Sequence, residues 1–197
     1  MSRYEGSDTY TYPDSEVLKN KADLREQTAL EAFEADATAI RLLELIEHPL
    51  PGNFDLAHLQ GIHRHLFQDV YDWAGQLRTV DISKGGSRFA NCGQIAHYLG
   101  QQLAKLPTEQ FLTGLPPHAF IERLAHYMGE INATHPFREG NGRVQRAFCA
   151  QLAENAGYFI DFETVNQAQM YAAMIASFQG DQHPLESLLE QITSIID

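Results

Sequence analysis

The sequence predicts an all-α protein with one short β-hairpin. Most segments carry apolar residues at three- and four-residue steps, which is the period of an amphipathic helix. Only residues 76–83 alternate apolar and polar side chains as a strand does. Hydrophobic residues make up 44% and charged residues 20% of the 197 residues, as in an ordinary globular domain. We therefore expect a single domain over residues 15–197, preceded by an arm without periodicity at residues 1–14.

The first two helices are predicted from their apolar stripes and from the residues that bound them. A helix over residues 24–47 ends at His48 and Pro49, and a second helix begins after Asp55, which suits an N-cap. The apolar positions are Leu30, Phe33, Ala37 and Ile40 in the first helix and Leu56, Leu59, Ile62, Leu66 and Phe67 in the second.

The hairpin is predicted where the helical pattern stops. Leu77, Val80 and Ile82 supply the alternating apolar positions of a strand. The stretch KGGS at 84–87 then provides turn residues, and RFA at 88–90 begins the returning strand.

Helical periodicity resumes over residues 94–106 and continues to the end of the chain. A helix after Pro116 and Pro117 is expected to be central, and another spans residues 143–156 before a C-cap signal. Thr164 is expected to cap a helix that reaches Phe178, and Pro184 to open the last one. The apolar stripe of the central helix is formed by Phe120, Ile121, Leu124, Met128 and Ile131.

The charge balance excludes several partners. A formal net charge of -12 repels a phosphate backbone, so neither a nucleic acid nor an anionic membrane is expected as the main partner. No apolar stretch approaches the ~20 residues that span a bilayer, and the N-terminus lacks the plan of a signal peptide. We therefore expect a cytoplasmic protein.

The cysteines and histidines outside the motif described next do not indicate a metal site. Cys92 and Cys149 lack CxxC spacing, so we expect reduced thiols, with Cys149 in a core. His58, His63 and His65 form a superficially metal-like group, but His63 and His65 point to different sides of a helix. Zinc is therefore not predicted.

Residues 135–146, HPFREGNGRVQR, form a turn between two predicted helices. Pro136 prevents the first helix from simply continuing. Gly140 and Gly142 allow consecutive N–H groups to point into one concavity, which the first-turn N–H groups of the next helix also face. Such a geometry binds anions, although GlyAsnGly alone is also a common tight turn.

The charged residues of this stretch favour a polyphosphate. Arg143 and Arg146 share one helix face, lean back over the turn, and oppose the helix dipole at a cost of ~0.3–1 kcal/mol each unless an anion compensates. Phosphate would repel Glu139 unless a magnesium ion bridges the two. His135 is then a base within reach of the phosphorus. Each residue alone has a more ordinary explanation, but their conjunction favours a catalytic phosphate site.

Two other residues of the stretch are given structural roles. We expect Phe137 to anchor the turn against the core as an apolar side chain, and we expect Arg138 to be exposed.

The stretch resembles the signature HPFx(D/E)GNGRxxR of the Fic (filamentation induced by cyclic AMP) domain at every specified position. The segments YPDSEVLKNK, LFQDVYDWAGQLRTVDISKG and GDQHPLESLL also resemble parts of bacterial Fic proteins, so the similarity spans most of the chain. The resemblance implies a Fic-type helical bundle with a β-hairpin flap. It also implies transfer of AMP from ATP to a hydroxyl side chain of a target protein.

The resemblance implies a role for each residue of the motif. His135 would deprotonate the target hydroxyl, and Glu139 would hold Mg²⁺ at the α- and β-phosphates. Arg143 would bind the β-phosphate and Arg146 the γ-phosphate. The cofactor-binding set comprises Phe137, Gly140, Asn141, Gly142, Arg143 and Arg146, with the phosphates cradled by the N–H groups of Gly140, Asn141 and Gly142.

The hairpin is the predicted target-docking flap. Its exposed edge could pair with an extended target segment, or it could merely close the pocket. The residues assigned to it are Val80, Asp81, Ile82, Ser83 and Lys84. For the adenine pocket, the resemblance points to the helix that contains Asn166, Gln167, Met170 and Tyr171. The alternative is that these four residues only form the core and surface of an amphipathic helix.

Many Fic proteins are inhibited by a helix bearing (S/T)xxxE(G/N), whose glutamate pairs with the second arginine of the motif. No glutamate of this chain has Ser or Thr four residues earlier. We therefore expect a separate small helical antitoxin, as in class I toxin–antitoxin pairs, whose glutamate forms a bidentate pair with Arg146.

Three alternatives remain open at this level. The enzyme could use another donor and transfer UMP or phosphate. It could be a secreted effector that modifies host GTPases, rather than a toxin that acts on the ATPase subunits of topoisomerases. It could also be a non-catalytic binding module. The intact GlyAsnGly, His135 and Glu139 favour the adenylyltransferase.

Overall fold

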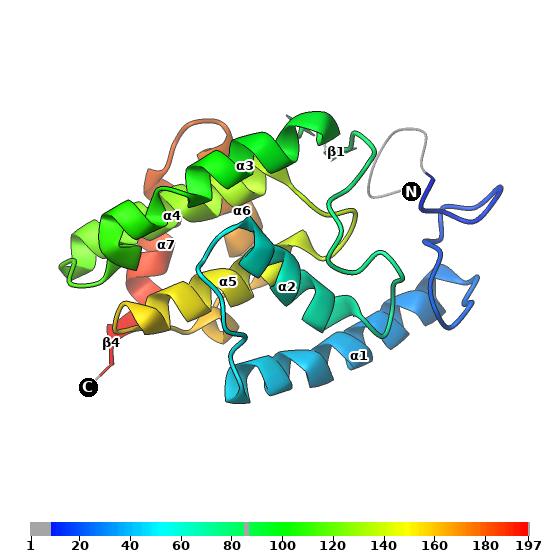
Figure 1. Cartoon of the computed structure of the whole chain (residues 1–197), viewed down its shortest axis with the longest axis horizontal. Helices are drawn as coiled ribbons and strands as arrows, with labels where there is room; N and C mark the ends of the chain where they lie inside the picture. Colours follow the sequence, from blue (N-terminus) through cyan, green and yellow to red (C-terminus); the bar gives the residue numbers. More distant parts are fainter. Residues whose placement is uncertain (1–8, 85–86, 197) are drawn as a thin grey trace.

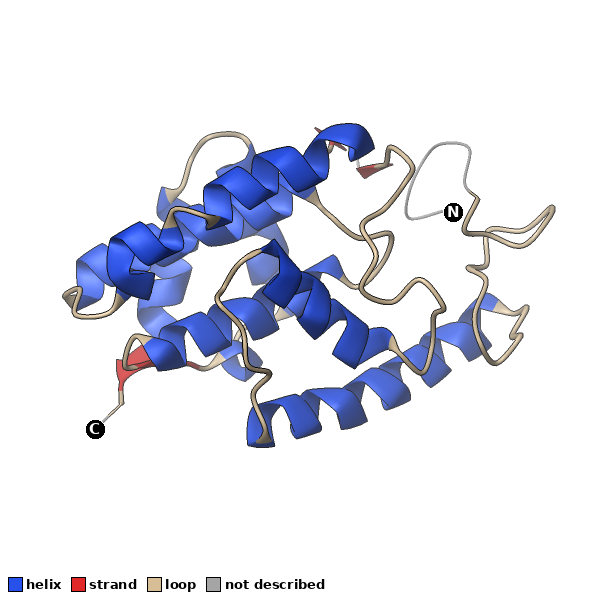
Figure 2. Cartoon of the chain, viewed as in Figure 1, coloured by secondary structure: helices blue, strands red, loops and turns tan. Residues whose placement is uncertain are grey.

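The computed structural model describes residues 9–84 and 87–196 (Figure 1). Over these residues the protein is predominantly helical, and its strands are confined to two short two-stranded sheets (Figure 2). The predicted fold class, an all-α bundle with a short hairpin, is confirmed. The helices are α1 (Gln27–Glu47), α2 (Leu56–Phe67), α3 (Ile95–Leu103), α4 (Pro117–Thr134), α5 (Asn141–Asn155), α6 (Gln167–Phe178) and α7 (His183–Ile192).

The strands and the short 3-10 helices occupy the connections between the α-helices. The strands are β1 (Ser83–Lys84), β2 (Ser87–Arg88), β3 (Tyr158–Ile160) and β4 (Thr193–Ile195). The 3-10 helices are η1 (Cys92–Gln94), η2 (Leu106–Leu112) and η3 (Phe162–Thr164).

Helices α4 and α5 pack together at the centre of the bundle. Helices α3, α6 and α7 contact α4, while α2 contacts both α5 and α1 (Figure 1). All five residues of the predicted α4 stripe are buried, and Phe120, Leu124 and Met128 are fully enclosed. The expectation of a central helix here is confirmed. The C-terminal end of α4 and the N-terminal end of α5 are thereby held side by side.

Helix α1 differs from its prediction in its first residue and in its buried face. It begins at Gln27, and its buried residues are Leu30, Glu34, Thr38 and Leu45. Ile40, expected on the apolar stripe, is 60% exposed. The buried row advances mainly in steps of four, which is the ridge that packs against a neighbouring helix. A glutamate and a threonine therefore face inward where apolar residues were predicted.

The hairpin is shorter than predicted, and a second sheet was missed. Strand β1 pairs antiparallel with β2, but residues 77–82 form no strand, and the GlyGly turn at 85–86 lies outside the described residues. One reason is that Arg78 N–H donates to Pro136 O at 2.9 Å, so this segment bonds to the turn after α4 instead of to a strand. Strands β3 and β4 pair antiparallel between segments far apart in the sequence.

The predicted helix caps are partly confirmed. Asp55 accepts from His58 N at 2.8 Å, and Pro184 lies in the first turn of α7. Thr164 does not cap α6, because it belongs to η3. Asn166 takes that place in a reciprocal capping box with Gln169.

The described part of the N-terminal arm is packed against the domain. Tyr10 hydroxyl lies 3.2 Å from Thr79 Oγ1, and its ring meets Trp73 edge-on with the centroids 5.4 Å apart. Thr11 forms an isolated antiparallel bridge with Leu18. Residues 9–14 thus contain turns and a single β-bridge, and they contact the bundle.

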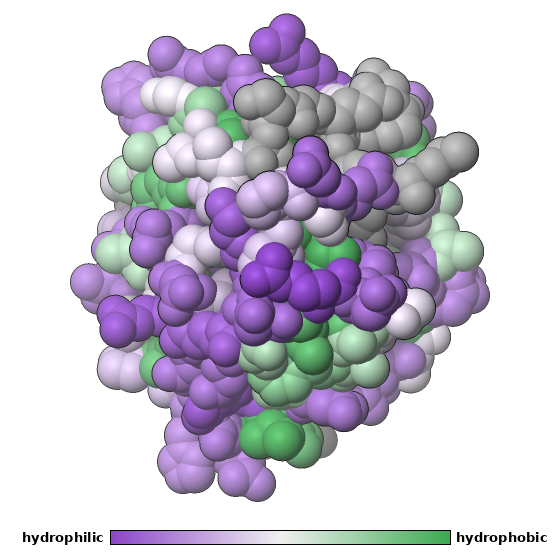
Figure 3. All heavy atoms as spheres, turned by 90° about the vertical axis from the view of Figure 1, so that its right-hand side faces the viewer, coloured by the Kyte–Doolittle hydropathy of each residue, from purple (hydrophilic) through white to green (hydrophobic). Residues whose placement is uncertain are grey.

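The surface and the cysteines agree with the composition. The face shown in Figure 3 is mostly hydrophilic, with small hydrophobic patches between the polar side chains. In residues 9–84 and 87–196, no helix is both long and apolar enough to span a membrane. Cys149 is buried as expected, and burial raises the pKa of its thiol to about 12.

Candidate functional site

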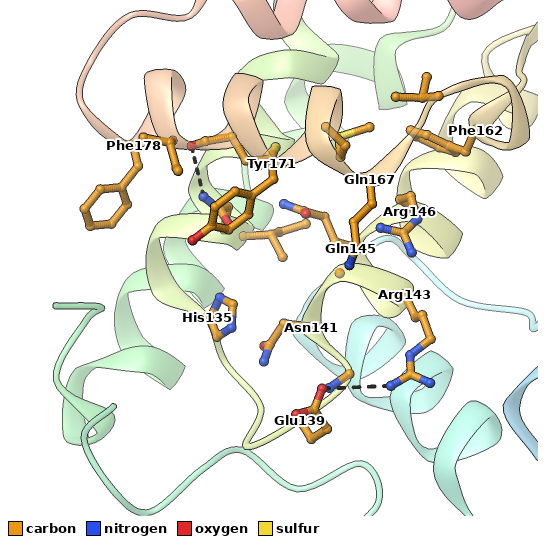
Figure 4. Close-up of a pocket in the computed structure, with 18 of the residues that line it drawn as sticks. His135, Glu139, Asn141, Arg143, Gln145, Arg146, Phe162, Gln167, Tyr171 and Phe178 are labelled. Atoms are coloured by element: carbon orange, nitrogen blue, oxygen red, sulfur yellow. Dashed lines mark hydrogen bonds and ion pairs between the residues drawn. The ribbon is translucent and has the colours of Figure 1, made fainter. Parts of the chain in front are cut away.

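A cavity of about 670 Å³ opens between α1, α4, α5 and α6 (Figure 4). Its two ends differ in chemistry. One end is lined by apolar and aromatic side chains, namely Phe162, Val165, Met170, Tyr171, Met174, Ile175 and Phe178. The other end is lined by charged side chains and by the start of α5, namely Glu31, Glu34, Glu139, Gly140, Asn141, Gly142, Arg143 and Arg146. His135 lies in the wall between them.

The turn that joins α4 to α5 is fixed through its own backbone. The Asn141 side chain accepts from Phe137 N and donates to Phe137 O, both at 2.8 Å. His63 Nε2 bonds Glu139 O at 3.1 Å, and Arg78 bonds the carbonyl oxygens of the residues before Phe137. Polar backbone groups in a buried turn need such partners. The conformation of the motif is therefore set by residues on both sides of it.

Gly140 is required by the fold of this turn. Its φ is +81°, in the left-handed region, and a Cβ there would lie 2.1 Å from Phe67 Cζ. This close approach lets the chain enter α5 directly against α2.

Replacing Gly140 with alanine is therefore expected to destabilise the protein by about 2 to 5 kcal/mol, from backbone strain and overpacking together. Urea denaturation measures the change. Gly61→Ala is the matched control, because that helical glycine has no atom within 4 Å of its would-be Cβ and should stabilise by about 0.5 to 1 kcal/mol. Equal stabilities of the two variants would contradict this account of the turn.

His63 is a buried, neutral residue that supports the turn. Its ring stacks on Phe137 with the centroids 4.0 Å apart and on Phe67 at 4.8 Å. Gly75 N–H donates to Nδ1 at 2.7 Å, so Nε2 carries the proton and donates to Glu139 O. Burial lowers the pKa of His63 to about 4. Both ring nitrogens of His63 are thus used in hydrogen bonds, and its ring is used in packing.

The lowered pKa of His63 predicts a loss of stability in acid. Between pH 6.5 and about 4 the unfolded chain binds a proton at this residue that the folded protein does not, so stability falls as pH falls through this window. The loss from His63 is on the order of 3 kcal/mol. Denaturation at pH 7.5 and pH 4.5 should show a smaller loss for His63→Asn than for the wild type. Equal losses would show that His63 is not the responsible group.

His135 ends α4 in a left-handed conformation, with φ 44° and ψ 64°. Such a conformation is uncommon for a residue other than glycine, and it costs on the order of 1 to 3 kcal/mol. It turns the chain sharply and directs the imidazole to the cavity (Figure 4). The ring stacks on Phe89 with the centroids 4.0 Å apart and an angle of 14°.

Arg143 is held by α1. Its guanidinium forms an ion pair with Glu34 and donates to Thr38 Oγ1 at 3.1 Å. Glu34 also accepts a hydrogen bond from the Tyr71 hydroxyl, and burial together with the Glu34 charge raises the pKa of Tyr71. The expectation that both arginines lean back over the turn thus needs refinement, because Arg143 is fixed at the side of the cavity against α1.

Arg146 faces the cavity without a carboxylate partner. Among the described residues, no Asp or Glu oxygen lies within 4 Å of its guanidinium, whereas Arg143 has Glu34 and, at 3.9 Å, Glu139. Burial and the nearby Arg143 lower the pKa of Arg146. A partly buried cation of this kind is stabilised by a bound anion.

Glu139 lies at the start of the charged end. One carboxylate oxygen accepts from Gly140 N at 2.9 Å and lies 3.9 Å from Arg143 Nη2. Its side chain is 12% exposed and lines the cavity.

The positions of three further residues can be compared with the predictions. Phe137 is fully buried and does not line the cavity, which agrees with its expected role as an apolar anchor. Arg138 is only 4% exposed, so the prediction of an exposed side chain is wrong. Asn166 caps α6 and does not line the cavity, while Gln167, Met170 and Tyr171 from the same predicted group do.

The flap, which we define as residues 79–84 and 87–91, is only partly exposed. Ile82 is buried, and Asp81 accepts from Cys92 N at 2.7 Å and from Asn91 Nδ2 at 2.8 Å. Asp81 therefore joins one limb of the flap to the end of the other limb, and Ile82 packs into the protein interior. Within the predicted docking segment, the regular strand comprises Ser83 and Lys84.

Sequence reasoning missed several residues of the cavity because they come from other elements. Glu34 is the main one. The sequence indicates it only through its spacing, because it lies four residues after Leu30 and therefore on the same, buried face of α1. Phe89 precedes the motif by more than forty residues, and the fold of the flap brings its ring onto His135. The other cavity-lining residues that were not predicted are Glu31, Ala35, Ile131, Asn132, Gln145, Phe162, Val165, Met174, Ile175 and Phe178.

A helical bundle whose cavity is apolar at one end and carries two arginines beside a helix N-terminus at the other, with a histidine between, has the features of a nucleotide-binding enzyme. The family model described as Fic/DOC family matches residues 53–153, which is more than half of the chain. The chain therefore belongs to the Fic/DOC family, and the resemblance seen in the motif is confirmed.

Two relatives show how far the similarity extends. The protein adenylyltransferase VbhT of Bartonella schoenbuchensis is 45% identical over 97% of this chain, which spans 40% of that relative's length. A protein of Escherichia coli named Probable protein adenylyltransferase Fic is 38% identical over 96% of this chain and 94% of its own length. The names of these relatives agree with the enzyme class that the motif implied.

Solved structures share the fold over nearly the whole chain. The N-terminal Fic domain of a Bartonella quintana effector with bound ADP has a TM-score of 0.89 and 32% identity, covering 95% of each chain. BepC of Bartonella tribocorum with bound AMPPNP has a TM-score of 0.89 and 30% identity, covering 95% of this chain and 97% of its own.

Proposed function

We propose that this chain transfers AMP from ATP to a serine, threonine or tyrosine hydroxyl of a target protein. The observation that supports it most is that Arg146, without a carboxylate partner in the described residues, and the imidazole of His135 face one cavity. Two solved relatives were crystallised with ADP and with AMPPNP, and two relatives are named adenylyltransferases.

The two ends of the cavity suit the two ends of ATP. The apolar end, with Met170 and Tyr171, offers surface on which a base can pack, while the two arginines of the charged end meet the phosphates. Arg143 would bind the β-phosphate and Arg146 the γ-phosphate. The N–H groups at the start of α5 add donors directed at an anion.

His135 would act as the general base. It accepts the proton of the target hydroxyl, whose oxygen forms a bond to the α-phosphorus of ATP. The bond from that phosphorus to the α–β bridging oxygen breaks, and pyrophosphate leaves. The arginines stabilise the charge that collects on the leaving group, which is the main contribution of a protein to phosphoryl transfer.

Glu139 would hold Mg²⁺ together with the phosphates. Magnesium is often bound through only one or two protein carboxylates plus phosphate and water oxygens. Glu139 lines the cavity beside Gly140, and the described residues offer no group of three or more His, Cys, Asp or Glu side chains for a metal ion. Bound Mg²⁺ supplies neutralisation of phosphate charge. Glu139→Gln should therefore raise the Mg²⁺ concentration needed for half-maximal transfer, and an unchanged requirement would contradict this role.

The flap would dock the target at its open edge. Strand β1 pairs with β2 on one side, and Ser83 and Lys84 form the regular part of the predicted segment, which also includes Val80. Because Ile82 and Asp81 are engaged within the flap, pairing through the backbone fits this segment better than side-chain recognition. A photo-crosslinking residue at Ser83 should capture the modified target, whereas one at exposed Arg64 should not.

A separate antitoxin would restrain the enzyme. Its glutamate would pair with Arg146 and exclude the γ-phosphate. Support comes from the exposure of Arg146 to the cavity and from the lack of the (S/T)xxxE(G/N) pattern in this sequence. Expression of the chain alone in bacteria should arrest growth, and the His135→Ala variant should not. Harmless accumulation of active enzyme would count against this proposal.

The reaction and its target are tested together by mass spectrometry. The purified chain with ATP is expected to add the mass of AMP to a protein of a bacterial lysate, and we propose a topoisomerase ATPase subunit as that protein. Addition of phosphate, or of UMP when UTP is supplied in place of ATP, would indicate the alternative donors. Labelling confined to small GTPases in a host-cell lysate would favour the secreted effector. No labelling of any protein, with the antitoxin absent, would support a binding module.

A further inference from the structure

Arg78 is a fully buried arginine at the base of the flap, and neither the motif nor the cavity includes it. Its side chain is 0% exposed. Three nitrogens donate to four main-chain oxygens: Nε to His135 O at 2.8 Å, Nη1 to Val80 O at 2.7 Å, and Nη2 to Ala90 O at 2.5 Å and Thr134 O at 3.1 Å. A buried charge is costly unless it is hydrogen-bonded this fully.

The four oxygens belong to two different parts of the molecule. Thr134 and His135 are the last residue and the C-cap of α4, where the carbonyl groups have no helical partner and the helix dipole favours a cation. Val80 and Ala90 lie on the two limbs of the flap, on either side of the β1–β2 hairpin. One guanidinium therefore ties both limbs of the flap to the end of α4.

The arrangement requires an arginine rather than any cation. A guanidinium presents five N–H groups in a rigid planar fork, so it can reach acceptors that lie in different directions at once. A lysine ammonium has three donors at a single point, and from one position it cannot replace the contacts of Nε and Nη1 together.

The same two parts also meet through a ring contact and a further backbone hydrogen bond. Phe89 of the flap stacks on the His135 ring, and Ala90 N–H donates to Ala133 O at 3.3 Å. Arg78 thus holds His135 through its backbone carbonyl, and Phe89 holds the His135 ring. Phe89 is next to Ala90, whose carbonyl also accepts a hydrogen bond from Arg78. The flap and His135 are consequently joined through both backbone hydrogen bonds and a ring contact.

We propose that Arg78 is a positioning residue that keeps the target-binding edge of the flap and the imidazole of His135 in a fixed relative position. This inference rests on the proposed transfer reaction, in which the flap presents the hydroxyl and His135 removes its proton. The guanidinium bonds main-chain oxygens and contacts neither the target hydroxyl nor the imidazole ring, so its effect is on the alignment of the reacting atoms. Misalignment of reactants by about 1 Å can cost about 100-fold in rate.

The test compares Arg78→Met with the wild type in three measurements. The kcat for AMP transfer is expected to fall about 10- to 100-fold. The Kd for ATP should change less than about twofold, because Arg78 does not contact the arginines and N–H groups of the charged end. Hydrogen–deuterium exchange should increase together in peptides covering the flap and residues 131–140.

Two further variants separate positioning from general stability. Arg123→Met removes another arginine, which is paired with Glu109 and Tyr127 outside the cavity, and should lower stability without lowering kcat or exposing the flap. Arg78→Lys keeps the charge but loses the fork, so its kcat and exchange should lie between those of wild type and Arg78→Met. If Arg78→Met does not fold, the kcat and the exchange of Arg78→Lys are compared with those of Arg123→Met under conditions of equal stability. A lower kcat and faster flap exchange in Arg78→Lys alone would support positioning.

The outcomes distinguish this inference from the proposed function. A wild-type protein that transfers no AMP refutes the proposed function. In that case, a joint increase of hydrogen–deuterium exchange in the flap and residues 131–140 of Arg78→Met would still support Arg78 as the residue that connects the two. An active wild type with kcat and exchange unchanged in Arg78→Met and Arg78→Lys overturns the inference. A proportional loss of ATP binding in Arg78→Met would also overturn it, because the residue would then support the whole cavity.

Discussion

Replacing His135 with alanine is expected to lower the rate of AMP transfer by about 10²- to 10⁴-fold, the range that general base catalysis contributes. The target hydroxyl would then lose its proton acceptor, while the apolar and charged ends of the cavity stay intact. The Kd for ATP should therefore stay within about twofold of the wild-type value. Labelled ATP transfer and isothermal titration calorimetry measure the two quantities on the same preparation.

His126→Ala is the matched control for this experiment. His126 lies on α4 like the residues just before His135, but it does not line the cavity. The control should keep the wild-type transfer rate. Residual transfer in His135→Ala above about one tenth of the wild-type rate would refute the role of His135 as the base, and an equal loss in His126→Ala would point to a structural cause.

Replacing Arg146 with methionine is expected to weaken ATP binding by about 30- to 150-fold, since a charge-assisted hydrogen bond to a phosphate contributes roughly 2 to 3 kcal/mol. ADP has no γ-phosphate, so its affinity should fall much less. Arg143→Met should instead weaken ADP and ATP alike, because Arg143 is assigned to the β-phosphate. Calorimetric titration with both nucleotides measures these ratios.

Exposed Arg64 on α2 provides the control for the loss of one positive charge. Arg64→Met should leave the affinities for ADP and ATP unchanged at physiological salt, because a distant exposed charge is screened. An equal loss of ADP and ATP affinity in Arg146→Met would contradict the assignment of Arg146 to the γ-phosphate.

The parts of the site that lie close together in the sequence were the ones that the sequence could predict. The interval between α4 and α5 is short, so the turn with Pro136 and Gly140 and the first two turns of α5, with both arginines, are encoded in one continuous stretch. The stripe of α4 was also correctly predicted, since a helix buried on a wide face shows a clear 3.6-residue period.

Contacts over long sequence distances could not be predicted in the same way. Glu34 meets Arg143 from a helix more than one hundred residues earlier, and Arg78 meets His135 across fifty-seven residues. Arg138 was expected to be exposed because a charged residue usually is, yet the packing of the turn encloses it. Such positions depend on tertiary packing, and a single sequence carries no periodic signal for them.

The cavity draws on both flanks of the segment that the Fic/DOC family model matches. Glu34 comes from α1, before residue 53, and Met170 and Tyr171 come from α6, after residue 153. A fragment trimmed to residues 53–153 would contain every letter of the signature but would lack the carboxylate that holds Arg143 and much of the apolar wall. The smallest unit able to form the complete pocket therefore extends from α1 to α6, and the motif marks its centre.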